Sequence, residues 1–127
     1  MIVLDASAAV LGLLADGEAR EQMRGEALAG PHLIDAEVLH ALRGQVRRGT
    51  IDDRAARRAV RAWRALGLER FAVVGLAERI WDLRDNVTAY DACYVALAEV
   101  LDVPLVTADA RLAATPGPRC RTTVLRS

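Results

Sequence analysis

Short apolar runs alternate along the chain with longer segments whose apolar residues recur at helical spacing. Runs rich in Ile, Val and Leu predict strands, and they lie at residues 1–4, 32–34, 71–74, 104–106 and 122–125. Helical spacing predicts helices at residues 6–14, 18–29, 35–48, 53–66, 76–84 and 88–101, and a short helix that begins at 109. We therefore expect an α/β fold of three layers, with a central, mostly parallel sheet covered by helices on both faces.

Turn-forming and capping residues mark the expected ends of these helices. Gly30–Pro31 is a strong breaker after the second helix, and Gly49 follows the third. Asp35 and Thr88 are placed to cap the helices that follow them. No repeat or interdomain linker interrupts residues 1–127, so we expect a single domain with one core.

The composition is typical of a globular protein with an aliphatic core. Hydrophobic residues make up 53% of the chain and charged residues 27%, whereas aromatic residues make up only 4%. No apolar run approaches the ~18 residues of a membrane span, and the start MIVLD has no basic region of a secretory signal. Cys93 and Cys120 form no CxxC pair, so we expect a cytoplasmic protein with reduced thiols.

Four acidic residues occupy positions where parallel α/β folds place their chemistry. Asp5 directly follows the first strand and Asp109 follows the strand near residue 106, while Glu37 and Asp91 lie in first turns of helices. Each acid alone could simply favour a helix N-terminus, and Asp91 resembles the acid of a capping box opened by Thr88. Together, however, they would converge on one edge of the sheet if the strands are neighbours.

Such convergence favours a divalent cation. Two carboxylates ~5 Å apart repel by ~3 kcal/mol at an effective dielectric constant of ~20. Mg²⁺ or Mn²⁺ relieves this repulsion and prefers oxygen ligands. Zinc is disfavoured because no His or Cys accompanies the acids in the pattern, and we expect structural or surface roles for His32 and His40.

Three segments of the chain resemble the PIN-domain family, and in particular the VapC-type ribonuclease toxins of toxin–antitoxin pairs. They are MIVLDASAAV, HLIDAEVLHALR and NVTAYDACYVALAEVLDVPLVTADARL, and the similarity extends over essentially the whole chain. The resemblance implies a PIN-like fold, and its acidic positions fall on Asp5, Glu37, Asp91 and Asp109. Its polar helper positions fall on Ser7 and Thr107.

The same resemblance implies a metal-dependent endoribonuclease. The acids would hold one or two Mg²⁺ or Mn²⁺ ions, which activate a water molecule for attack on the scissile phosphate. Asp5 and Asp91 are the expected direct ligands, whereas Asp109 and Glu37 would bind directly, bind through water or orient the nucleophile. Ser7 and Thr107 would orient the ligands or contact phosphate.

Arginine supplies every positive side chain of this chain, which has no lysine. Eight of the 17 arginines lie between residues 43 and 64, and several recur at helical spacing. Among these, Arg54, Arg58 and Arg61 are candidates for contacts with RNA phosphates, although the net charge is zero. The alternative is a solvated helix face without a binding role.

The resemblance also implies an RNA substrate, a cognate antitoxin and a homodimer. Apolar side chains of the N-terminal half would either line an antitoxin groove or belong to the core, namely Leu11, Leu14, Leu39, Leu42 and Val46. For Trp63 and Trp81, the sequence does not distinguish a position in the core from one at an interface.

Competing interpretations lack residues that they need. A receiver domain and a dehalogenase-like phosphatase both require a lysine, and the latter requires an acid where this chain has Ser7. A nucleotide-binding fold should show a glycine-rich turn after the first strand, which is absent here. The alternatives that stay open are an inactive PIN-like module that binds a protein or RNA and, less favoured, cleavage of DNA.

Overall fold

A computed structural model describes residues 1–126 and shows one parallel five-stranded sheet in the order β3-β2-β1-β4-β5. The strands are β1 (Ile2–Leu4), β2 (Leu28–Pro31), β3 (Leu68–Phe71), β4 (Leu105–Thr107) and β5 (Thr122–Val124). The short apolar run at the N-terminus thus becomes the central strand. The expected α/β fold with a parallel sheet is confirmed.

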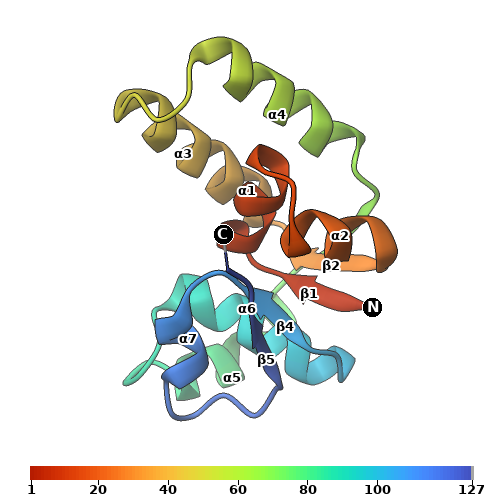
Figure 1. The fold of residues 1–127 in the computed structure, drawn as a ribbon. Coiled ribbons are helices and arrows are strands. Elements are labelled where there is room, and N and C mark those ends of the chain that lie inside the picture. The colour runs from red at the N-terminus through yellow and green to blue at the C-terminus, as the bar shows by residue number, and fades with distance from the viewer. Residues whose placement is uncertain (127) are drawn as a thin grey trace.

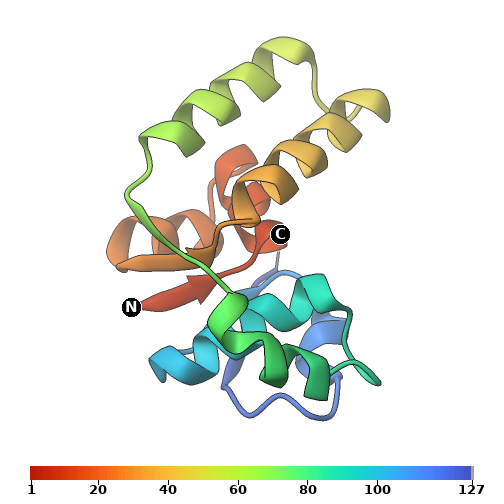
Figure 2. The ribbon, with the colours of Figure 1, turned by 180° about the vertical axis from the view of Figure 1, so that it is seen from behind.

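Helices cover both faces of this sheet. They are α1 (Ala6–Leu14), α2 (Glu18–Gly25), α3 (Ile34–Arg47), α4 (Asp53–Ala65), α5 (Ala77–Asp82), α6 (Ala89–Leu101) and α7 (Ala110–Ala114), with a 3-10 turn η1 (Val74–Leu76) before α5. Helices α1 to α4 lie on one side, where α3 and α4 form a projecting arm, and α5 and α6 lie on the other (Figures 1 and 2). No helix among residues 1–126 is both long enough and apolar enough to cross a membrane.

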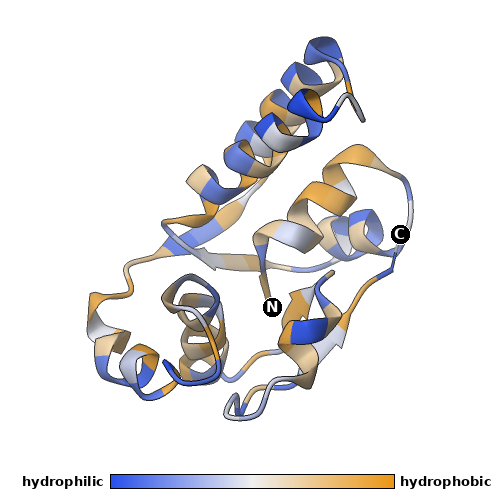
Figure 3. Ribbon diagram, turned by 90° about the vertical axis from the view of Figure 1, so that its left-hand side faces the viewer, coloured by the Kyte–Doolittle hydropathy of each residue, from blue (hydrophilic) through white to orange (hydrophobic). Residues whose placement is uncertain are grey.

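The core is aliphatic and centres on β1 and α6. Ile2, Val3 and Leu4 are all buried, as expected for the middle strand of a sheet covered on both faces. Residues 92–98 of α6 are buried without interruption, because this helix packs against β1, β2 and β4. Figure 3 shows apolar residues along the strands and α1, whereas the arm mixes apolar and polar residues.

Two strands lie three or four residues earlier than the sequence predicts. The expected strand at 32–34 is wrong, since β2 is Leu28–Pro31 and the preceding helix α2 ends at Gly25. Gly30 and Pro31 therefore belong to the strand itself rather than interrupting the chain before it. Proline is tolerated at this strand end, and a side chain at Gly30 would crowd Ile34, whose Cδ1 lies 3.2 Å from the position of a Cβ.

The third strand is also displaced toward the N-terminus, by three residues. It is Leu68–Phe71 rather than 71–74, because Leu68 is buried whereas Val74 is 84% exposed in the 3-10 turn. An apolar pair such as Val73–Val74 therefore does not always mark a strand.

Asp35 links three elements instead of capping a helix. The predicted N-cap is wrong, since α3 begins at Ile34. The Asp35 carboxylate accepts hydrogen bonds from Arg70 Nε at 2.7 Å, Arg70 Nη2 at 2.8 Å and Trp63 Nε1 at 2.8 Å. These bonds join the start of α3 to the end of α4 and to β3, and Arg70 keeps the pKa of Asp35 below its usual value.

Replacing Asp35 with Asn should destabilise the fold at neutral pH but not in strong acid. A lowered pKa in the folded state means that the carboxylate stabilises the fold above its usual value of 3.8 and loses this effect as the pH falls further. The urea midpoints of wild type and variant should differ more at pH 7 than at pH 3, because pH 3 lies below the usual pKa of 3.8. Asp53→Asn is the control, because Asp53 and its partner Arg57 are exposed. A difference that is the same at both pH values would contradict this account.

Candidate active site

The centre of the site lies where the connections of the sheet change direction. From β1 the sheet continues to β2 on one side and to β4 on the other. The loops that follow β1 and β4 therefore diverge, and such a point is the usual ligand site of an open parallel sheet. Asp5 directly follows β1, and its backbone N–H donates to Val106 O at 3.0 Å, so it lies beside the end of β4.

Asp5 is a buried carboxylate held by three donors. Its Oδ1 accepts from Ser7 Oγ at 2.6 Å and from the backbone N–H of Ala8 at 2.9 Å, while Oδ2 accepts from the Thr107 hydroxyl. Only 5% of the residue is exposed, and this burial raises the pKa of Asp5 although the three hydrogen bonds oppose the shift. Within residues 1–126, no basic side chain forms an ion pair with Asp5.

Ser7 and Thr107 connect the ends of the two strands around Asp5. Ser7 Oγ lies 3.2 Å from Thr107 Oγ1 and accepts from the backbone N–H of Ala108 at 2.9 Å. Thr107 Oγ1 accepts from the backbone N–H of Asp109 at 3.0 Å. Ser7 and Thr107, the helper positions that the family resemblance implies, therefore both hold Asp5 by hydrogen bonds. Their contact with a phosphate stays a prediction.

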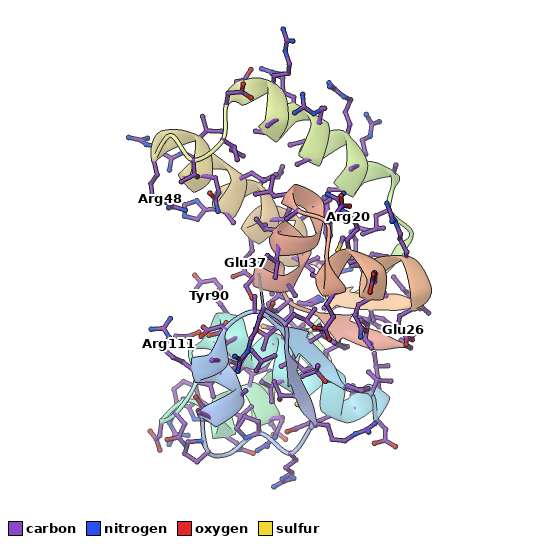
Figure 4. The ribbon with its side chains drawn as sticks, in the orientation of Figure 1. Arg20, Glu26, Glu37, Arg48, Tyr90 and Arg111 are labelled. Carbon is purple, nitrogen blue, oxygen red and sulfur yellow. The ribbon has the colours of Figure 1, made fainter. Side chains whose placement is uncertain are left out.

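Glu37 approaches the same region from the arm. It lies in the first turn of α3, and the hydroxyl of Tyr94 donates to its Oε1 at 2.5 Å. Partial burial raises the pKa of Glu37, and the charges of Asp91 and Asp5 raise it further. Figure 4 shows Glu37 between the arm and the lower helices.

Tyr94 is a site residue that sequence reasoning missed. It follows Asp91 by three residues on α6, so both lie on neighbouring positions of one helix face. That spacing is a local signal of a shared site, but a tyrosine in a long apolar helix is more typical of the core.

Asp91 and Asp109 each lie at the start of a helix and also belong to the four predicted acids. Thr88 caps α6 as predicted, since its Oγ1 accepts from the backbone N–H of Asp91 at 3.2 Å. Burial raises the pKa of Asp91, the charge of Asp109 adds to this shift, and Arg111 opposes it. Asp109 is the N-cap of α7, and its Oδ1 accepts from the backbone N–H of Arg111 at 3.0 Å.

The four predicted acids lie near enough to act on one another electrostatically. The charge of Asp91 raises the pKa of both Asp5 and Glu37, and the charge of Asp109 raises that of Asp91. Asp91 thus interacts electrostatically with each of the other three. The two histidines are exposed, and His32 acts electrostatically on Asp35.

The donor chemistry of this group fits a hard divalent cation. Its members present only carboxylate and hydroxyl oxygens, and Mg²⁺ and Mn²⁺ prefer such ligands. Among residues 1–126, Asp109 is the one member of the group that forms an ion pair, with Arg111 Nε at 3.4 Å. In the same part of the chain, no three His, Cys, Asp or Glu side chains are grouped closely enough to form a metal site.

The candidate RNA-binding arginines are not part of this group. Arg54, Arg58 and Arg61 are exposed on α4, at the opposite end of the molecule from α6 and α7 (Figures 1 and 3). Arg61 borders a groove of about 560 Å³ between α3 and α4, and Arg58 borders one of about 480 Å³ between α1, α2 and α4.

The apolar residues of the N-terminal half divide between core and surface. Leu42 and Trp63 are buried, whereas Leu39 is 45% exposed and Trp81 is 66% exposed. Leu14 lines the groove between α1, α2 and α4, and the α3–α4 groove is lined by Leu39, Leu42 and Val46. These side chains therefore line two separate grooves, and Leu42 also belongs to the core.

Comparisons with known proteins agree with this geometry. The PIN-domain family model matches residues 2–118. Ribonuclease VapC9 of Mycobacterium tuberculosis is 50% identical over 125 residues, which are 98% of each chain. The solved structure of PAE2754 from Pyrobaculum aerophilum has a TM-score of 0.71 at 27% identity, covering 95% of this chain and 82% of that one. That of VapC20 of Mycobacterium tuberculosis, a sarcin-ricin loop cleaving toxin, has a TM-score of 0.65 at 20% identity, with coverages of 90% and 94%. This chain therefore belongs to the PIN-domain family and, within it, to the VapC ribonucleases.

Proposed function

We propose that this VapC ribonuclease is a Mg²⁺- or Mn²⁺-dependent endoribonuclease and acts as the cytoplasmic toxin of a toxin–antitoxin pair. Its active site would consist of Asp5, Glu37, Asp91 and Asp109. One observation carries the proposal: Asp5 is buried beside the ends of β1 and β4, and Asp5, Glu37 and Asp91 each have a pKa raised chiefly by burial without forming an ion pair among the described residues. A fold gains nothing from such an arrangement unless a cation or a substrate compensates for the repulsion.

Each residue has a defined task in this proposal. A divalent ion, when bound, would polarise the scissile phosphate and lower the pKa of a water molecule. Asp5, fixed by three donors, and Asp91 would hold the ion directly. Glu37 and Asp109 would complete the oxygen shell or orient the attacking water, while Ser7 and Thr107 keep Asp5 in place.

Cleavage of a structured RNA by the purified chain tests the proposal. We expect no cleavage in a chelator and recovery of cleavage when Mg²⁺ or Mn²⁺ is added in excess. An inactive binding module would retain RNA without cutting it under either condition. Unchanged cleavage in the chelator would contradict metal dependence, and equal cutting of single-stranded DNA would contradict RNA as the substrate.

The protein partners of this chain in the proposal are a cognate antitoxin and a second copy of the chain. We expect the antitoxin to occupy the groove between α1, α2 and α4, where Leu14 and Met23 offer an apolar floor. Co-purification with the product of a small adjacent reading frame tests the antitoxin. Sedimentation at twice the chain mass of 13.7 kDa tests the homodimer.

Removing three of the five arginines of α4 should weaken RNA binding without affecting the chemistry. The combined Arg54→Ala, Arg58→Ala and Arg61→Ala variant should raise the KM for RNA and leave kcat nearly unchanged. Each lost phosphate contact should reduce the salt dependence of binding by about 0.7 in the log–log slope. Arg57→Ala is the control, because Arg57 pairs with Asp53 at 2.8 Å. Equal affinities of wild type and triple variant would show that this face is only solvated.

A further inference from the structure

The hydroxyl of Tyr94 joins the two helical layers at the candidate site. Tyr94 is 1% exposed within α6, yet its hydroxyl donates to Glu37 Oε1 on α3 at 2.5 Å, across 57 positions of sequence. A buried phenol needs a hydrogen-bond partner. Here that partner is an acid of the site rather than a backbone carbonyl.

This bond is the one that orients Glu37. Asp5 is held by three donors, so the loss of one would leave it in place. Within residues 1–126, Tyr94 is the only hydrogen-bond partner of the Glu37 carboxylate, and it engages Oε1 alone. The second oxygen, Oε2, therefore has no hydrogen-bond partner among the described residues, and the charges of Asp91 and Asp5 act on this carboxylate.

We propose that Tyr94 is a positioning residue that fixes the Glu37 carboxylate with Oε2 available to the metal or its bound water. This inference rests on the proposed function of the acid group. Tyr94 itself touches neither RNA nor the reacting atoms. Its phenol ring packs in the core, and only its oxygen serves the site, so ring and oxygen are separable by mutation.

Tyr94→Phe removes that one oxygen and keeps the ring. Removing a hydrogen bond to a charged group, or displacing a carboxylate by about 1 Å, lowers the rate of catalysis by roughly tenfold or more. We expect kcat to fall by at least about tenfold with little change in the KM for RNA. Calorimetric titration with Mn²⁺ should show a weaker affinity than wild type.

A double-mutant cycle separates positioning from packing. If Tyr94 acts through Glu37, Tyr94→Phe should cause no further loss of cleavage or of Mn²⁺ affinity when Glu37 is already alanine. Tyr90→Phe is the matched control, since Tyr90 lies on the same helix but is 67% exposed, and it should match wild type.

Two results would overturn the inference. One is an unchanged kcat and Mn²⁺ affinity in Tyr94→Phe. The other is an equal loss in the wild-type and Glu37→Ala backgrounds, accompanied by a lower melting temperature, which indicates a packing role. Full activity of Glu37→Ala alone would instead contradict the proposed site, so the two failures are distinguishable.

Discussion

Replacing Asp5 with Asn is expected to reduce RNA cleavage by about 1,000-fold while the chain remains folded. The carboxylate lies at the change of direction of the sheet, beside Asp91, and its charge is the part of the side chain that a cation would use. Asparagine keeps the size and the acceptor oxygen but removes the charge. Initial rates on one RNA at saturating Mg²⁺ measure the effect.

The fold should tolerate this change because Asp5 combines two separable roles. As N-cap of α1 it accepts from the backbone N–H of Ala8, and asparagine caps helices about as well as aspartate. The variant also removes a charge that burial disfavours, as the raised pKa of Asp5 indicates. In a chelator at pH 7, the unfolding free energies of wild type and variant should agree within about 1 kcal/mol.

Asp52 provides a control with the same local geometry. It caps α4 by accepting from the backbone N–H of Ala55 at 2.8 Å, but it is exposed on the arm. Asp52→Asn should therefore leave cleavage unchanged. Equal activity of Asp5→Asn and Asp52→Asn would mean that Asp5 is only a cap.

Saturating Mn²⁺ should raise the melting temperature of the wild-type chain by about 10 °C. At ~100 times the dissociation constant, binding to the folded state alone stabilises it by ~2.7 kcal/mol, and ~1 kcal/mol shifts the midpoint of a domain of this size by about 4 °C. Differential scanning calorimetry at pH 7.5, with and without the ion, measures the shift.

The shift should shrink as the solution becomes acidic. Asp5, Glu37 and Asp91 have a raised pKa, so the folded chain binds their protons more tightly than the unfolded chain does. The burial of their charges, together with their mutual repulsion, thus costs stability as the pH rises through these values, and either protons or the ion can remove that cost. Protons therefore compete with Mn²⁺, which should stabilise the chain less at pH 5 than at pH 7.5.

Asp91→Asn should abolish this stabilisation, whereas Asp53→Asn should retain it. Asp91 interacts electrostatically with the other three acids, while Asp53 is exposed and pairs with Arg57 on the arm. A melting curve that ignores Mn²⁺, or an equal shift in both variants, is incompatible with a metal site at these carboxylates.

The placement of the four acids could be predicted because it depends on topology. Asp5 and Asp109 follow strands, and parallel neighbouring strands bring their ends to one edge whatever their exact bounds. An error of four residues in β2 did not matter, since Glu37 still lies in the first turn of α3. The error itself arose because Gly30–Pro31 marks a turn in most contexts but here ends a strand.

Side-chain partners that are distant in sequence could not be predicted. Local pattern assigned Asp35 to a helix cap, but its partners Trp63 and Arg70 are 28 and 35 positions away. Tyr94 has the periodicity of a core residue, and its ring does lie in the hydrophobic core. Its hydroxyl acquires a role only because α3 places Glu37 opposite it, which no local pattern contains.

Anomalous diffraction from crystals grown with Mn²⁺ would locate the ion itself. We expect a peak bounded by the carboxylates of Asp5 and Asp91, with Glu37 and Asp109 beside it. A crystal at saturating Mn²⁺ that shows no peak there, or only a peak elsewhere on the chain, would contradict this expectation.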